Sequence, residues 1–185
     1  MEDSKNKKSI LGELISWAKS LAMALIIALL INNFLLVNAS IESGSMETTI
    51  MTGDRVLCHR LAYLTQDPSR FDVVIFNYTQ DDGEAIKYVK RIIGLPGETV
   101  DIVDGKVYID SSPTPLPDSF TNGSPHGDFG PFEVPEDHYF VLGDNRNNSY
   151  DSKSWLDPYL PQDKILGKVF CTYYPIPGLL SKVTG

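Results

Sequence analysis

The feature that most constrains this chain is an uncharged apolar stretch near its N-terminus, from Ser20 to Val37, interrupted only by Asn32 and Asn33. As a helix, its 18 residues reach the lower end of the roughly 17 to 25 that span the hydrocarbon core of a bilayer. An uncharged stretch of this length is long for a buried core helix. We therefore expect a membrane anchor over residues 20–37, and the lipid bilayer is the first partner that the sequence predicts.

The charges that flank this stretch predict its orientation. All four lysines of the region, the last of them Lys19, precede the apolar residues. Because positive charge stays on the cytoplasmic side, residues 1–19 are expected in the cytoplasm and residues 38–185 outside the cell. The chain would thus be a single-pass protein of the cell membrane. A cleaved secretory signal is the rival interpretation, with a cut after Ala39, but the stretch exceeds the usual 7 to 15 apolar residues of a signal. Self-cleavage at Ala39 stays open.

The composition excludes several function classes for the part after the anchor. A net charge of -8 argues against nucleic-acid binding, which depends on neutralised phosphates. Cys58 and Cys171 are too few for a disulfide framework, although a single disulfide stays open. His59, His126 and His138 match no metal-ligand spacing, so we expect no metal and no other cofactor.

The rest of the chain has the pattern of short strands and turns. Segments rich in β-branched and aromatic residues predict several strands, and Asp104-Gly105 predicts a tight hairpin turn. The predicted strands are residues 56–61, 71–78, 100–103, 106–109, 138–142 and 165–174. Residues 110–135 are rich in Pro, Ser, Gly and Asp and predict a long surface loop. The expected fold class is therefore all-β, with folded or barrel-like antiparallel sheets and one N-terminal transmembrane helix.

A candidate nucleophile, Ser45, lies in the segment IESGSM at residues 41–46, soon after the predicted anchor. A serine hydroxyl attacks a carbonyl only when a neighbouring base takes its proton. Taken alone, Ser-Gly-Ser is typical of a flexible linker. The three histidines lie in segments that favour surface or structural roles, so the sequence does not predict a Ser/His/Asp triad.

A candidate base, Lys90, lies in the predicted strand IKYVKRII at residues 86–93. Alternate residues of a strand share a face, so Lys90 has Tyr88 and Ile92 beside it, whereas Lys87 and Arg91 share the other face. Apolar surroundings lower the pKa of a lysine, and a general base must be unprotonated. A lysine that extends past its apolar neighbours into water is the alternative.

A polar loop, GDNRNNSYDSK at residues 143–153, follows a strand with a buried pattern. Its Asn, Asp and Ser side chains predict a tight turn held by bonds to nearby backbone groups. Calcium binding is disfavoured, because Arg146 interrupts the series of oxygen ligands and no glycine follows at the required place.

Together these segments resemble the type I signal peptidases, in the compact form of Gram-positive bacteria. The likeness rests on four boxes in order, and it extends from the anchor to about Phe170. The boxes are SGSM at 43–46, GDRVL at 53–57, YVKR with GLPG at 88–97, and GDNR through Asp151-Ser152 at 143–152.

The resemblance implies roles for the matching residues. Ser45 would be the nucleophile and Lys90 the general base, with the Ser45 amide and the Ser43 hydroxyl as the oxyanion hole. Ser149 would hydrogen-bond the lysine and orient it. Supporting roles fall on Asp144, Arg91 and Asp151, with Asp144 and Arg91 paired across two boxes.

The resemblance also implies the substrate. The chain would be a monomeric serine endopeptidase that removes signal peptides from secreted precursors, cutting after small residues in an Ala-x-Ala-like site. Candidate walls of the substrate pocket are Ile41, Met46, Ile50 and Tyr88. A dedicated processing peptidase for a surface-assembly system and a catalytically silent assembly module are the alternatives. The second is disfavoured because Ser45 and Lys90 are both present.

Three residues depart from the family's usual pattern. Thr48 stands where a proline is common, Asn147 where an aspartate is common, and Lys153 where an arginine is common. A lysine cannot form the two parallel hydrogen bonds that an arginine gives a carboxylate, so its pairing with Asp151 would be weaker. None of the three removes a catalytic group.

Overall fold

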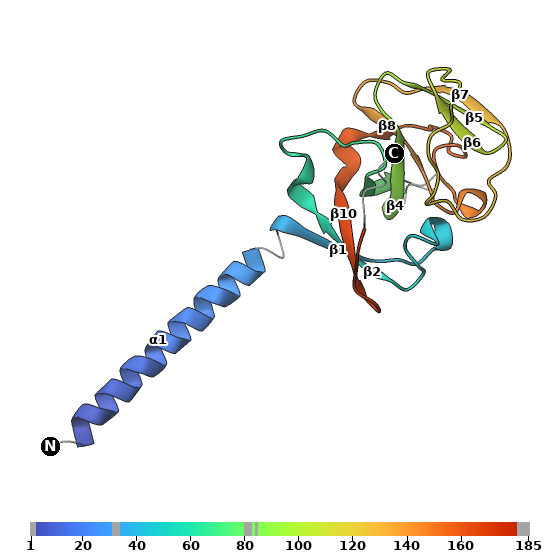
Figure 1. Cartoon of the computed structure of the whole chain (residues 1–185). Helices are drawn as coiled ribbons and strands as arrows, with labels where there is room; N and C mark the ends of the chain where they lie inside the picture. Colours follow the sequence, from blue (N-terminus) through green and yellow to red (C-terminus); the bar gives the residue numbers. More distant parts are fainter. Residues whose placement is uncertain (1–2, 31–33, 80–82, 84, 181–185) are drawn as a thin grey trace. The chain divides into compact units, whose positions relative to one another are not determined.

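The structure is a computed structural model that describes residues 3–30, 34–79, 83 and 85–180. The chain divides into two compact units, Met1–Leu36 and Val37–Gly185. The predicted antiparallel β-fold with one N-terminal apolar helix is confirmed (Figure 1).

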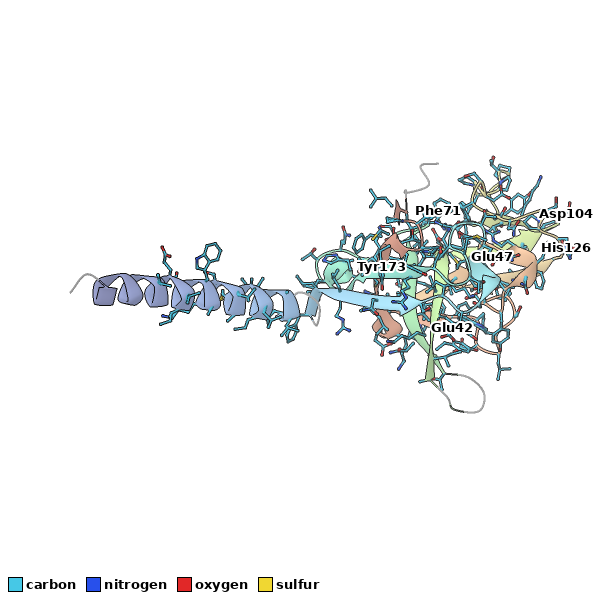
Figure 2. All side chains as sticks on the ribbon, turned by 90° about the horizontal axis from the view of Figure 1, so that it is seen from below. Glu42, Glu47, Phe71, Asp104, His126 and Tyr173 are labelled. Carbon is cyan, nitrogen blue, oxygen red and sulfur yellow. The ribbon has the colours of Figure 1, made fainter. Side chains whose placement is uncertain are left out.

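The first unit is built around one helix, α1 (Asp3–Leu30). Within it, Gly12–Leu30 is long and apolar enough to cross a membrane, with a mean hydropathy of 1.8. The described side chains of this stretch project outward around the helix and are exposed (Figure 2). The predicted boundaries at 19/20 and 37/38 stay a prediction; residues 31–33 of the predicted anchor lie outside the described residues, and its last two, Leu36 and Val37, lie in strand β1.

The second unit consists of two sheets. The larger has the strand order β1-β2-β10-β3-β4-β8-β9, with β11 beside β10, and the smaller has the order β6-β5-β7. The strands of the larger sheet are β1 (Leu36–Ser40), β2 (Arg55–His59), β3 (Val73–Thr79), β4 (Ala85–Gly94), β8 (His138–Leu142), β9 (Leu160–Pro161), β10 (Ile165–Tyr174) and β11 (Gly178–Leu179). Those of the smaller sheet are β5 (Thr99–Val103), β6 (Lys106–Ile109) and β7 (Phe129–Glu133).

Short 3-10 helices lie in the connections. They are η2 (Gly44–Met46), η3 (Arg60–Tyr63), η4 (Arg146–Asn148) and η5 (Gln162–Lys164). The η2 turn carries the predicted nucleophile, and η4 lies in the polar loop after β8. Both 3-10 helices are therefore part of the site rather than of the sheet.

The loop predicted for residues 110–135 is wrong in one part, because it contains β7. Gly130 and Pro131 lie inside this strand and give it the composition of a loop. β7 pairs antiparallel with β5, where Val100 lies opposite Phe132. The strand therefore depends on a partner about 30 residues earlier in the chain.

Strand β4 positions the site because it is long and because the half that follows Val89 is covered on both faces. It pairs with β3 from Ala85 to Arg91, and Lys90 lies opposite Val74. It pairs with β8 only from Arg91 onward. Its second half is buried on both faces, since Ile92 belongs to one apolar cluster and Ile93 to another. The side chains of two consecutive residues, Lys90 and Arg91, are therefore both removed from water.

Candidate active site

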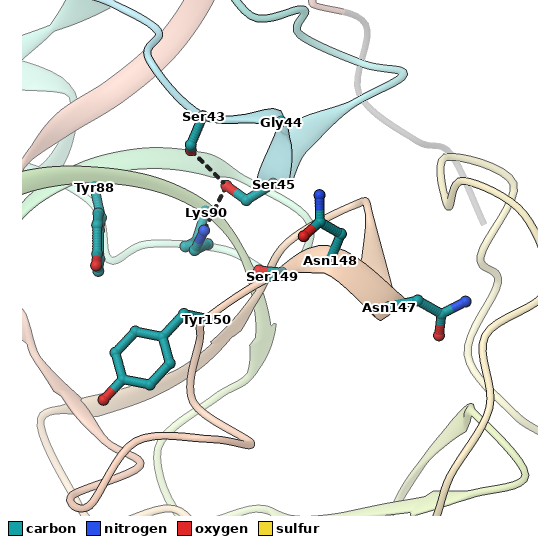
Figure 3. Close-up of a pocket in the computed structure, with 9 residues that line it drawn as sticks. All are labelled: Ser43, Gly44, Ser45, Tyr88, Lys90, Asn147, Asn148, Ser149 and Tyr150. Atoms are coloured by element: carbon teal, nitrogen blue, oxygen red, sulfur yellow. Dashed lines mark hydrogen bonds between the residues drawn. The ribbon is translucent and has the colours of Figure 1, made fainter.

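The hydroxyl of Ser45 lies next to the amine of Lys90. Ser45 is in the η2 turn and 7% exposed, and Lys90 is in β4 and 2% exposed. Lys90 Nζ donates a hydrogen bond of 2.6 Å to Ser45 Oγ. Ser43 Oγ lies 3.3 Å from Ser45 Oγ on the other side, as Figure 3 shows. The arrangement brings the predicted nucleophile, the predicted base and a second hydroxyl together at one point.

The environment of Lys90 favours its neutral form. Burial lowers its pKa from 10.5 to about 8, because a charged amine loses its hydration there. The charges of Asp151 and Asp144 act in the opposite direction, and that of Lys153 adds to the lowering. The amine lies 5.2 Å from the centre of the Tyr88 ring, on the face predicted from the alternation of β4. A lysine of this kind can accept a proton near neutral pH.

Asp144 and Arg91 form an ion pair beside this site. Arg91 Nε donates to Asp144 Oδ1 at 2.8 Å and Nη2 donates to Oδ2 at 2.6 Å, so the pairing is bidentate. Arg91 Nη1 donates to the carbonyl of Phe71 at 2.9 Å, and the guanidinium lies 4.2 Å from the centre of the Phe120 ring. Thr49, which follows the departure from proline at position 48, donates its hydroxyl to Asp144. These contacts join β4, the nucleophile turn and the polar loop.

Asp151 supports the polar loop from inside. Its Oδ2 accepts the backbone N–H of Gly143 at 2.9 Å, and its Oδ1 accepts a bond of 3.0 Å from Lys153 Nζ. The lysine makes this single contact with the carboxylate and a second, of 3.3 Å, with the carbonyl of Ser149. The loop therefore has its own buried carboxylate, fully shielded from solvent.

Ser149 does not make the hydrogen bond that was expected of it. It lines the pocket beside Ser45 and Lys90 (Figure 3). Its Oγ is buried, yet it has no hydrogen-bond partner among the described residues. Lys90 Nζ donates to Ser45 Oγ. The lysine-orienting role of Ser149 therefore stays a prediction, and the structure contains no hydrogen bond between Ser149 Oγ and Lys90.

A groove extends from Ser45 between the segment 38–43 and the first half of β4. Of the predicted pocket walls, Ile41, Met46 and Tyr88 line it. Ile50 does not line it, because its side chain is fully buried in the apolar cluster behind the groove. Residues 85–89 of β4 pair only with β3 among the described strands, so the backbone edge of β4 that faces away from β3 is free along this groove.

The other candidates of the sequence lie elsewhere. None of the three histidines lines either pocket at Ser45, and His138 Nδ1 bonds the carbonyl of Glu136. Among the described residues no three His, Cys, Asp or Glu side chains are grouped to hold a metal ion. Cys58 and Cys171 are free thiols, and burial raises the pKa of Cys58 to about 12.

The predictions from the sequence missed some residues of the site, Asn145 among them. Asn145 contacts the nucleophile turn with both its side chain and its backbone, across about 100 residues of chain. Its place in GDNR indicated only a polar turn. The contact depends on how β8 and η2 meet in space, and no spacing in the sequence predicts it.

Comparison with known proteins identifies the family. Residues 14–174 match the family model of signal peptidase, peptidase S26. A probable signal peptidase I-2 of Synechocystis sp. is 39% identical over 172 residues, which cover 88% of this chain and 75% of that protein. Signal peptidase I S of Bacillus subtilis is 36% identical over 183 residues, 94% of each chain. The crystal structure of a signal peptidase I from Enterococcus faecalis V583 is 31% identical, covers 56% of this chain and 97% of that one, and has a TM-score of 0.45.

The chain therefore belongs to the signal peptidase family, peptidase S26. The enzyme class predicted from the sequence, a hydrolase of the signal peptidase I type among the serine endopeptidases, is confirmed by this membership.

Proposed function

We propose that this enzyme removes N-terminal signal peptides from secreted precursors, with Ser45 as nucleophile and Lys90 as general base. The observation that carries the proposal is the 2.6 Å contact between Lys90 Nζ and Ser45 Oγ in a buried setting. Family membership supports the substrate class. The lowered pKa of Lys90 supports its role, because a base must be unprotonated to act and a pKa of about 8 makes the neutral amine far more available near neutral pH than in an ordinary lysine.

The chemistry follows from these two side chains. Ser45 Oγ attacks the scissile carbonyl carbon while its proton passes to Lys90 Nζ. The negative oxygen that develops accepts hydrogen bonds from the Ser45 amide and from the hydroxyl of Ser43, which lies 3.3 Å from Ser45 Oγ. Lys90 then returns the proton to the departing amine, and the C–N bond breaks. In the second half, Lys90 takes a proton from a water that attacks the acyl-Ser45 ester, and it returns that proton to Ser45 Oγ as the ester C–O bond breaks.

The groove supports an extended substrate with small side chains. A peptide strand can add to the free edge of β4 at residues 85–89 and place its residues along Ile41, Met46 and Tyr88. Because Met46 and Ile41 are nearly fully buried, they close the floor close to Ser45 and leave little depth for a side chain there. This agrees with cleavage after small residues.

The membrane location follows from α1. Its segment Gly12–Leu30 would span the bilayer, residues at the N-terminal, lysine-bearing end would stay in the cytoplasm, and the β unit would act outside. Insertion of α1 tethers the enzyme to the surface at which precursors emerge, which raises its effective concentration there. The enzyme acts as a monomer in this proposal, because one chain supplies Ser45, Lys90 and the groove.

The test is cleavage of a purified secretory precursor by the full-length enzyme in detergent. Ser45→Ala and Lys90→Met should each lower kcat/KM by at least about 1,000-fold. Lys164→Met, which makes the same change at an exposed lysine of η5, is the matched control and should retain activity. Mass spectrometry of the products should place the cut after a small residue. Equal cleavage by Lys90→Met and the unaltered enzyme would reject the dyad.

A further inference from the structure

Asn145 holds the nucleophile turn at two consecutive carbonyl groups. Its side-chain Nδ2 donates to the carbonyl of Gly44 at 3.0 Å, and its backbone N–H donates to the carbonyl of Ser45 at 3.0 Å. Asn145 is itself fixed in the loop, because its own carbonyl accepts the N–H of Asn148 at 3.0 Å. The residue thus joins the loop after β8 to both peptide groups that flank Ser45.

The planarity of the peptide bond gives this contact a consequence for catalysis. The bond between Gly44 and Ser45 is trans, so the Gly44 carbonyl and the Ser45 N–H point in opposite directions. A donor that holds the carbonyl on one side therefore aims the N–H toward the other side. The N–H of Glu47 approaches the same carbonyl at 3.2 Å, so Asn145 is the second of two donors that fix it.

The Ser45 amide is free to serve a substrate. Among the described residues the structure gives this N–H no acceptor. On the far side of Ser45, the second contact of Asn145 fixes the peptide group between Ser45 and Met46. With both flanking peptide groups fixed, the backbone of Ser45 cannot rotate, and its amide and its Oγ keep one relative geometry.

We propose that Asn145 is a positioning residue of the oxyanion hole, whose side-chain amide aims the Ser45 N–H at the developing negative oxygen. The inference rests on the proposed nucleophile, Ser45. Without the Nδ2 donor the peptide group between Gly44 and Ser45 can tilt, and the Ser45 amide leaves the point where charge develops. Since an oxyanion hole acts in the transition state and not on the bound substrate, the loss falls on kcat and leaves KM nearly unchanged.

The same loop offers a matched control. Asn147 is also an asparagine, and its Nδ2 also donates to a backbone carbonyl at 3.0 Å, that of Ser124. Asn147 also lines the pocket at Ser45, but this bond is exposed and leads to Ser124, not to residues 44–46 that carry Ser45. Replacing either asparagine by aspartate removes the side-chain NH2 group that donates and adds one negative charge. Asn147→Asp therefore measures how an added negative charge and a lost loop hydrogen bond change kcat and KM while the contact of Asn145 with Gly44 is kept.

The experiment compares kcat and KM of Asn145→Asp, Asn147→Asp and the unaltered full-length enzyme on a precursor peptide, from pH 6 to pH 10. We expect Asn145→Asp to lower kcat by about 10- to 100-fold, less than the loss of a whole oxyanion donor, with KM within about 3-fold. The loss should persist on the plateau at high pH, where Lys90 is deprotonated in every variant. A negative charge that acted only by raising the pKa of Lys90 would lose its effect there.

Two further measurements separate positioning from general damage to the fold. In a Ser45→Ala background, Asn145→Asp should leave the Kd of the uncleaved peptide within about 3-fold. With Ser45 intact, inhibition by a peptide aldehyde, which serine converts to a tetrahedral adduct, should weaken in proportion to kcat/KM. Asn145→Ala replaces the aspartate variant if that variant does not fold.

The outcomes are distinct. A kcat within about 3-fold of the unaltered enzyme on the plateau would overturn the inference, and so would equal losses in Asn145→Asp and Asn147→Asp. Failure of both Asn145 variants to fold would assign the residue to stability and reject the positioning role. Retained activity in Ser45→Ala or Lys90→Met would instead overturn the proposed function itself.

Discussion

Lys90 and Arg91 are neighbours on β4, and both are buried cations, yet the protein treats them in opposite ways. Arg91 has a bidentate carboxylate, a backbone carbonyl and an aromatic ring around its guanidinium. Lys90 has a hydroxyl at 2.6 Å and the ring of Tyr88, and no ion pair among the described residues. On one face of the strand the positive charge of Arg91 is paired with a carboxylate, whereas on the other face the amine of Lys90 is not.

The difference between the two residues follows from the chemistry of their side chains. A guanidinium remains protonated at any ordinary pH, so its burial requires a partner such as Asp144. An amine can lose its proton when it is buried, and the pKa of Lys90 is lowered to about 8 by that burial. A carboxylate beside Lys90 would keep it charged and unable to act as a base. The comparison predicts opposite effects on the free energy of unfolding: removing the charge of Asp144 should lower it, and removing the charge of Lys90 should raise it.

Asp144→Asn should destabilise the protein by about 3 to 5 kcal/mol, because it leaves the charge of Arg91 buried without its carboxylate. The side chains have the same shape, so the change tests charge and not packing. Urea unfolding of the full-length enzyme in detergent measures the free energy of unfolding. Asp157→Asn is the control, since Asp157 is exposed and accepts only a local bond from the N–H of Tyr159. A loss below about 1 kcal/mol at Asp144 would show that the pair does not stabilise the fold.

Lys90→Met should instead stabilise the protein, by up to roughly 3 kcal/mol at pH 7, while it removes activity. The sign follows from linkage. The pKa of Lys90 is about 8 in the folded state and 10.5 in the unfolded state, so below pH 8 folding must bury a charged amine. The unaltered enzyme therefore gains stability as pH rises from about 8 to 10.5, and the advantage of the methionine variant shrinks to nothing over that range.

The measurement is urea unfolding of both proteins at pH 7 and at pH 10.5. Lys164→Met, at an exposed lysine, should change stability little at either pH. If Lys90→Met were less stable than the unaltered enzyme at pH 7, the bond to Ser45 and the ring of Tyr88 would outweigh the burial of the amine, and the contrast with Arg91 would fail.

The sequence predicted those parts of the fold that depend on local pattern. Strands β8 and β10 have the predicted bounds, and the hairpin between β5 and β6 turns at Asp104 as expected. The two strands are continuous runs rich in β-branched and aromatic residues, and the hairpin has a turn with two residues suited to it. β7 was missed because Gly130 and Pro131 break its pattern, and it forms only by pairing with β5.

The site was less accessible to the sequence than the strands. Alternation alone placed Lys90 between Tyr88 and Ile92, but it grouped Arg91 with the exposed Lys87 and so gave no reason to expect Arg91 to be buried. Its partner lies 53 residues further along, and the pairing was expected only from the resemblance. The Asn145 contact spans 101 residues and had no signal at all. Long-range geometry decides these contacts, and a local pattern does not contain it.

The smallest effect expected concerns the pH dependence of activity. If Lys90 is the proposed general base it must be unprotonated to act, so kcat/KM should rise about tenfold per pH unit up to about pH 8 and then level off. The charge of Lys153 helps to lower the pKa of Lys90, whereas that of Asp151 raises it. Lys153→Met removes the first influence and leaves the second unpaired, since Lys153 is the ion-pair partner of Asp151.

The midpoint of the profile in Lys153→Met should therefore move to higher pH, by less than about one unit, while the plateau value of kcat/KM stays close to that of the unaltered enzyme. Lys153→Arg keeps the charge and should keep the midpoint. A shift to lower pH in the methionine variant would mean that Lys153 acts on Lys90 through the position of the loop rather than through its charge. In that case the low pKa of Lys90 would result from its burial alone, without a contribution from the charge of Lys153.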